Sequence, residues 1–100
     1  MARKRNDFEI CQDILAEAGT GILKTRLQFR VNLNFRNLSR FLDLLVQINL
    51  IEPYHEESDG KQFYRTTQKG KEVHEKLKEL STVLRKTGED KHVHKEVDAE

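Results

Sequence analysis

The stretch from Thr25 to Ile48, TRLQFRVNLNFRNLSRFLDLLVQI, decides the fold because it contains two helical patterns separated by a short turn. The second pattern repeats apolar residues at steps of three and four, which is the period of one helix face. Its members are Phe35, Leu38, Phe41, Leu42, Leu45 and Ile48. The first pattern is shorter, with Leu27 and Val31 facing inward, and it closes at Asn32-Leu33-Asn34. Two helices joined by a three-residue turn predict a helix-turn-helix.

Residues that cap helices mark where the other helical segments begin. Asn6 and Glu9 have the spacing of a capping box, which predicts a first helix over about 7–18. Thr25 and Gln28 have the same spacing and predict a cap for the first helix of the helix-turn-helix. Asn34 is expected to cap the second.

Three short runs are β-prone. Ile22-Leu23 predicts a brief extended segment, and the runs over 50–55 and 62–66 predict a hairpin closed by the turn residues Asp59-Gly60. Pro53 cannot donate a ladder hydrogen bond, so either its strand lies at a sheet edge or Pro53 occupies a position whose nitrogen points out of the ladder.

A last helix is predicted over 68–87, with Thr67 as its cap. Its apolar residues follow one another at steps of four, three and four, which is the spacing of the apolar seam in a coiled coil. They are Val73, Leu77, Leu80 and Leu84. A single stripe on a polar helix needs a partner, so we expect a homodimer through an antiparallel coiled coil formed with a second copy of this helix.

The predicted fold class is mainly α, an α+β winged helix ordered helix, strand, helix, helix, hairpin, long helix. In this fold the hairpin loop over 56–61 is the wing, and the second helix of the helix-turn-helix is the expected recognition helix. Four parts are expected: a basic arm over 1–6, the winged helix-turn-helix domain over 7–67, the dimerisation helix over 68–87, and an acidic tail over 88–100. The tail holds five acidic residues and two lysines with little apolar content, so it is expected to be disordered.

Several motifs resemble those of the small archaeal winged-helix proteins that dimerise through a long C-terminal helix. They are Gly21-Ile-Leu-Lys-Thr-Arg-Leu27, Asn32-Leu33-Asn34, Leu50-Ile51 and Tyr64-Arg-Thr-Thr-Gln-Lys-Gly70. The resemblance covers about residues 7–84, with Asn34-Phe35 in place of Ser-Tyr and Asn49 in place of Gly. It implies binding to double-stranded DNA and a role as a transcription regulator. Chromatin-type members are basic, whereas this chain has a net charge of +1, which favours a site-specific regulator.

The small net charge conceals a polarised distribution. Residues 6–19 contain four acidic residues and no Lys or Arg, whereas residues 20–47 contain five basic residues and one acidic residue, Asp43. The basic stretch coincides with the predicted helix-turn-helix, so it indicates local attraction to phosphate.

The candidate DNA-binding residues follow from this coincidence. Arg and Asn can hydrogen-bond guanine and adenine edges, and residues of this kind lie on the predicted recognition helix. They are Arg36, Asn37, Ser39 and Arg40, and the capping residue Asn34 is also counted among the DNA-binding residues. Phosphate contacts are expected from the start of the preceding helix and from the wing, at Lys24, Arg26, Arg30 and Lys61. Arg3, Lys4 and Arg5 could follow a groove as a basic arm. The alternative for the helix residues is a solvated surface.

Other functions find little support in the sequence. No nucleophile elbow or phosphate-binding glycine loop is present, so no enzyme activity is expected. The four histidines lack metal-ligand spacing, and neither a cofactor nor a small-molecule ligand is predicted. No apolar run approaches the ~20 residues of a membrane span. With one cysteine, Cys11, a cytoplasmic location is expected. The competing hypothesis is a winged-helix module that binds an acidic protein partner and does not read DNA.

Overall fold

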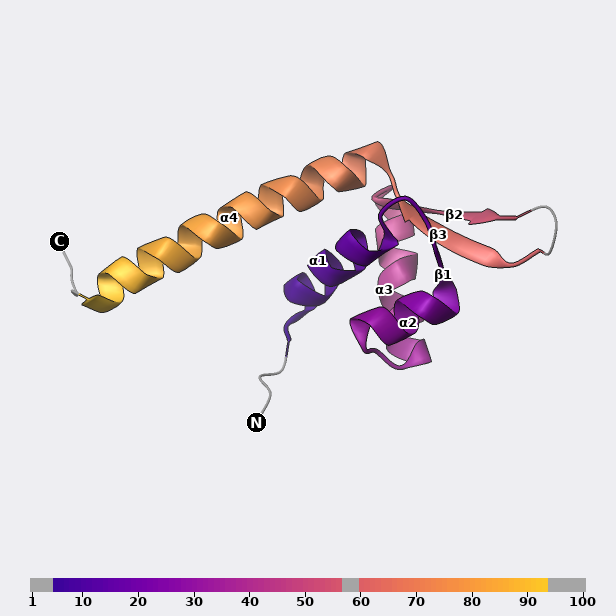
Figure 1. The fold of residues 1–100 in the computed structure, drawn as a ribbon, viewed down its shortest axis with the longest axis horizontal. Coiled ribbons are helices and arrows are strands. Elements are labelled where there is room, and N and C mark those ends of the chain that lie inside the picture. The colour runs from indigo at the N-terminus through magenta and orange to yellow at the C-terminus, as the bar shows by residue number, and fades with distance from the viewer. Residues whose placement is uncertain (1–4, 57–59, 94–100) are drawn as a thin grey trace.

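The computed structural model describes residues 5–56 and 60–93, which form a mainly helical winged helix, as predicted. The helices are α1 (Asp7–Ala18), α2 (Lys24–Val31), α3 (Phe35–Gln47) and α4 (Gln68–Val93), and the strands are β1 (Ile22–Leu23), β2 (Ile51–His55) and β3 (Gln62–Thr66). Figure 1 shows α1, α2 and α3 gathered beside the sheet, while the β2–β3 hairpin projects to one side and α4 extends to the other as a rod.

The core forms where the apolar stripe of α3 meets α1, α2 and the sheet. Leu38, Leu42 and Leu45 are almost completely buried, and Ile14 and Leu27 have no exposed surface. Their burial confirms the predicted apolar period of α3 at the centre of the helix. Each buried side chain of this kind contributes about 1.5–3 kcal/mol to the stability of the fold.

The three strands are antiparallel in the order β1-β3-β2, so β2 lies at an edge of the sheet. Pro53 is exposed and pairs in register with Tyr64 of β3. The predicted edge position of Pro53 is confirmed, because an edge strand tolerates a residue without an N–H.

The predicted caps differ in outcome. Asn6 and Glu9 form a complete capping box, with hydrogen bonds of 2.8 and 3.0 Å, and the Asn34 side chain accepts from the Asn37 N–H at 2.8 Å. The predicted cap at Thr25 is wrong, because α2 begins at Lys24 after Leu23 and has no side-chain cap. Leu23 pairs with β3, so the chain passes directly from strand to helix.

Two members of the predicted α3 stripe lie outside the core. Phe35 is 56% exposed and Ile48 is 44% exposed. Phe35 is the first residue of α3 and Ile48 is its C-cap. Both therefore lie outside the central part of the helix, which packs against the core. Their expected burial is therefore wrong.

Helix α4 continues to Val93, past the predicted end at 87. Gly88 costs a helix only about 1 kcal/mol, which the neighbouring helix formers can offset. The helix therefore runs beyond its predicted end, while the disorder expected of the tail stays a prediction, with 94–100 outside the described residues.

The junction between β3 and α4 lies tightly against the chain that follows α3. The Thr67 N–H donates to the Leu50 carbonyl at 3.0 Å, and the Thr67 hydroxyl donates to the Asn49 carbonyl at 2.8 Å. The same hydroxyl accepts from the Gly70 N–H at 2.9 Å, which confirms the predicted cap. A Cβ atom at Gly70 would collide with the Leu50 carbonyl oxygen. A glycine at this position therefore sets how closely α4 approaches the domain.

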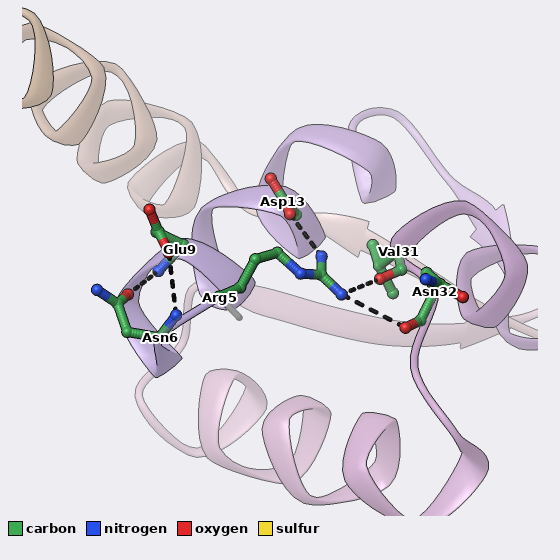
Figure 2. Close-up of polar contacts among 6 residues, drawn as sticks. All are labelled: Arg5, Asn6, Glu9, Asp13, Val31 and Asn32. Atoms are coloured by element: carbon green, nitrogen blue, oxygen red, sulfur yellow. Dashed lines mark hydrogen bonds and ion pairs between the residues drawn. The ribbon is translucent and has the colours of Figure 1, made fainter. Parts of the chain in front are cut away.

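Arg5 joins the start of α1 to the end of α2 (Figure 2). Its guanidinium lies 2.7 Å from a carboxylate oxygen of Asp13 and donates to the Val31 carbonyl at 2.6 Å and to the Asn32 carbonyl at 3.4 Å. A cation at the C-terminal end of a helix is also favoured by the helix dipole. Arg5 is therefore engaged within the domain, whereas Arg3 and Lys4, the other residues of the expected arm, lie outside the described residues.

Replacing Gly70 with alanine is expected to lower the free energy of unfolding by about 2–3 kcal/mol, since the new methyl group must displace the backbone at Leu50. Urea unfolding followed by circular dichroism measures the loss. Lys71→Ala, an exposed neighbour in the same helix, is the control and should leave the urea midpoint unchanged. An unchanged midpoint in Gly70→Ala would contradict the close approach.

Replacing Arg5 with alanine is expected to cost about 1–2 kcal/mol, because two carbonyls at the end of α2 lose a charged donor. Asp13→Asn should cost less, since Arg5 keeps both carbonyl contacts. The same urea experiment ranks the two variants. A larger loss in Asp13→Asn would show that the ion pair, and not the carbonyl contacts, holds this junction.

Candidate nucleic-acid interface

The rotation of α3 about its axis is set by its buried stripe, and this determines which polar residues reach the surface. Arg36 and Arg40 are exposed, while Asn37 and Ser39 are half-buried. Asn34 is exposed, but its side-chain oxygen is already used to cap the helix. The first turn of α3 contains no acidic residue. Arg36 is therefore an exposed hydrogen-bond donor at the N-terminal end of α3.

Lys24, the first residue of α2, lies beside the start of α3. Its ammonium group stands 4.3 Å from the centre of the Phe35 ring, in a cation–π arrangement. Lys24 also lines a hollow of about 350 Å³ together with Leu23, Thr25, Lys61 and Gln62. The N-terminal end of α2, the N-terminal end of α3 and the base of the wing therefore meet at Lys24.

The described part of the wing ends at Glu56 and resumes at Gly60. The Gly60 N–H donates to the Glu56 carbonyl at 2.9 Å, and the Glu56 N–H donates to the Lys61 carbonyl at 3.4 Å. These bonds close the loop and leave Lys61 exposed on the side of the wing where Lys24 lies.

Arg26 and Arg30 lie on another part of the α2 surface. Both line a hollow of about 320 Å³ around Phe29, which is 83% exposed. Arg30 also stands 3.6 Å from a carboxylate oxygen of Glu17 in α1. The acidic first helix therefore offsets part of the basic charge that the sequence places on α2.

Arg40 borders a groove between α1 and α3. Its guanidinium lies 4.8 Å from the centre of the Phe41 ring. The groove has a volume of about 450 Å³, and Asp7, Phe8, Cys11 and Leu44 complete its lining. Burial, and secondly the negative charge of Asp7, raises the pKa of the Cys11 thiol, which keeps it a weak nucleophile.

Phe35 is the surface residue that sequence analysis missed. The apolar period assigned it to the core, yet it stands exposed next to Arg36, with Lys24 against its ring. The signal in the sequence was its place directly after the capping residue Asn34: Phe35 is the first residue of α3, and the buried residues of that helix begin only at Leu38.

The predicted seam on α4 has two environments. Val73 packs against the core of its own domain, and Leu77 is half-buried. Leu80 and Leu84 are 49% and 61% exposed, and the neighbouring Val83 is 57% exposed. The distal part of the described helix thus presents an apolar surface to its surroundings.

Other kinds of site are not found in the part of the chain that the structure describes. Among the residues whose side chains the structure describes, 5–56 and 60–85, no three His, Cys, Asp or Glu residues gather in a way that could hold a metal ion. Within the same residues, no helix combines the length and apolar character needed to cross a membrane.

Comparison with known proteins places this arrangement in context. An uncharacterized protein of Methanocaldococcus jannaschii, MJ0287, is 30% identical over 82 residues, which cover 81% of this chain and 78% of that protein. Among solved structures, the fold is similar to Sso10a-2, a DNA-binding protein from Sulfolobus solfataricus, with a TM-score of 0.72 and 24% identity over 94% of this chain and 100% of that chain. It is also similar to Streptococcus pneumoniae FabT in complex with DNA, with a TM-score of 0.65 and 16% identity over 80% of this chain and 58% of that chain.

The relatives from Methanocaldococcus and Sulfolobus confirm the predicted resemblance to archaeal winged-helix proteins. The sequence itself matches the family described as winged helix-turn-helix over residues 4–85, which is most of the chain. With the helix-turn-helix, the three-stranded sheet and the wing strands all in place, this protein belongs to the winged helix-turn-helix family.

Proposed function

We propose that this protein binds double-stranded DNA as a homodimer, reads a specific sequence with α3, and regulates transcription. The observation that carries the proposal is the meeting of three elements at Lys24: the start of α2, the first turn of α3 and the base of the wing. A recognition helix inserted in the major groove brings its N-terminal residues to the base edges, while neighbouring elements contact the backbone.

The charge of this surface suits a polyanion. No acidic residue occurs between Thr20 and Leu42, a segment that includes all of α2 and the first two turns of α3. Lysine and arginine that neutralise phosphates release counterions, which supplies affinity without sequence preference. The net charge of +1 limits this general attraction, so the proposal assigns discrimination to a few placed side chains.

Each predicted residue receives a role in the proposal. Arg36, Asn37 and Ser39 contact base edges, with Arg36 the main reader because it is exposed in the first turn. Asn34 acts through its cap, which fixes the start of the helix. Arg40 also contacts base edges, and phosphate contacts are assigned to Lys24, Arg26, Arg30 and Lys61.

The similar structures support this function. Sso10a-2 is a DNA-binding protein, and FabT has been seen in complex with DNA. The proposal requires no catalytic group or cofactor, since recognition of this kind involves only non-covalent contacts. It implies a cytoplasmic location, where a regulator of an archaeal-type chromosome meets its DNA.

The proposed dimer uses the exposed apolar surface of α4. Leu77, Leu80 and Leu84 form a coiled-coil seam with α4 of a second copy, antiparallel to the first, and Val73 stands where the seam meets the domain. Two recognition helices then face two half-sites separated by about one helical turn of DNA or a multiple of it.

Replacing Arg36 with alanine should weaken binding to a duplex selected from a random pool by at least about tenfold, since a bidentate base contact is worth ~1–3 kcal/mol. Fluorescence anisotropy at fixed salt measures the change. Arg85→Ala removes the same charge from the exposed surface of α4, far along the rod, and should leave the affinity unchanged.

Phosphate contacts and base contacts should respond differently to substitution. Arg26→Ala is expected to weaken all duplexes about equally and to reduce the salt slope by about one unit per contact. Equal affinity of Arg36→Ala and the unaltered protein for the selected duplex would contradict the assignment of α3 as the reader.

A double change of Leu77→Lys and Leu84→Lys should convert the dimer into a monomer, because two charges in each helix would have to be desolvated at the seam. Sedimentation velocity measures the mass. Thr82→Lys adds a charge on the opposite side of the same helix and should leave the dimer intact. A dimer that persists in the double variant would locate the interface elsewhere.

The competing function, binding of an acidic protein partner, is favoured by one observation. Phe29 is 83% exposed and shares its hollow with Arg26 and Arg30, an aromatic and basic combination that suits an acidic peptide. Titration with random duplex DNA at moderate salt separates the two functions, since a DNA reader keeps measurable nonspecific affinity.

A further inference from the structure

Phe35 places an aromatic side chain on the proposed DNA-reading surface. It is the first residue of α3, directly before Arg36, and 56% of it is exposed. The Lys24 ammonium lies 4.3 Å from the ring centre, and Phe35 stays exposed with Lys24 in that position. An apolar surface therefore accompanies the hydrogen-bonding residues where α3 would meet base edges.

The chemistry of the major groove offers one apolar partner for such a ring. Each base pair presents donors and acceptors there, but thymine alone adds a C5-methyl group. Arg36 and Asn37 satisfy donors and acceptors and gain nothing from a methyl group. Phenylalanine is among the side chains that contact this methyl group.

Lys24 restricts where the ring can stand. A cation over an aromatic face is worth about 0.5–1 kcal/mol at an exposed site, enough to favour one side-chain orientation over the others. Lys24 begins α2, whereas Phe35 begins α3, so the contact ties the ring to an element outside its own helix. The Phe35 ring is therefore already restricted to one orientation in the free protein, so less side-chain entropy is lost when DNA binds.

We infer that Phe35 selects thymine within each half-site by packing against its methyl group, and that Lys24 is the positioning residue for the ring. This inference rests on the proposed function and adds one specificity: a T·A pair opposite the first turn of α3. It predicts discrimination against uracil, which has the same hydrogen-bonding edge but lacks the methyl group.

The test uses the full chain and a duplex selected by it from a random pool. Each thymine of the selected site is replaced in turn by deoxyuridine, and affinity is measured by fluorescence anisotropy. At one position in each half-site the unaltered protein should lose roughly fourfold in affinity, the factor that corresponds to burying one methyl group. All other replacements should change affinity less.

Substitutions test whether the preference for thymine over uracil depends on Phe35 and Lys24. Phe35→Ala should bind the thymine and uracil duplexes equally, whereas Phe35→Leu, which keeps an apolar contact, should retain part of the preference. Phe29→Ala removes an even more exposed phenylalanine from α2 and should leave the preference intact. Lys24→Ala should lower the thymine-to-uracil ratio, whereas Arg26→Ala, a matched loss of charge, should lower affinity for both duplexes and keep the ratio.

The outcomes separate this inference from the proposed function. A selected site that the protein binds tightly, with no position sensitive to uracil or with a preference that survives in Phe35→Ala, overturns the role of Phe35 and leaves DNA binding standing. Selected sites without a thymine in the half-site do the same. Failure to retain any duplex overturns both.

Discussion

The burial of Leu38, Leu42 and Leu45 on one side of α3 is the interaction on which the rest of the structure depends. These side chains are at most 2% exposed and share a core with Ile14 and Leu27. Because they fix the rotation of α3, they also decide that Arg36 reaches the surface and that Asn37 and Ser39 do so only in part. The same packing places the start of α3 next to Lys24 and, through Lys24, next to the wing.

Electrostatics divides the domain into two surfaces. Acidic residues of α1 pair with arginines that face them: Asp13 with Arg5 and Glu17 with Arg30. The acid-free start of α2 and first turn of α3 are left to supply positive potential. A chain with a net charge of +1 can therefore present a basic surface, and the proposal of selective DNA recognition depends on this local distribution.

Local patterns predicted the elements well because helix periods, caps and turn residues act over a few positions. The α3 stripe, the capping box of Asn6 and Glu9, and the edge position of Pro53 follow from such patterns. The positions of Arg5, Arg30 and Phe35 depend on contacts between residues far apart in the chain, and periodicity carries no information about those. Phe35 continues the apolar period of α3 but lies beyond the core, which only the packed structure reveals.

The central claim is that the start of α3 and its neighbours at Lys24 and the base of the wing form the DNA-binding surface. The most direct measurement is a titration of ¹⁵N-labelled protein with duplex DNA, followed by amide chemical shifts. The account predicts the largest changes at residues 24–26, 34–37 and 60–62, with little change along the exposed part of α4. Changes concentrated around Phe29 or on α4, with the start of α3 unaffected, would contradict it.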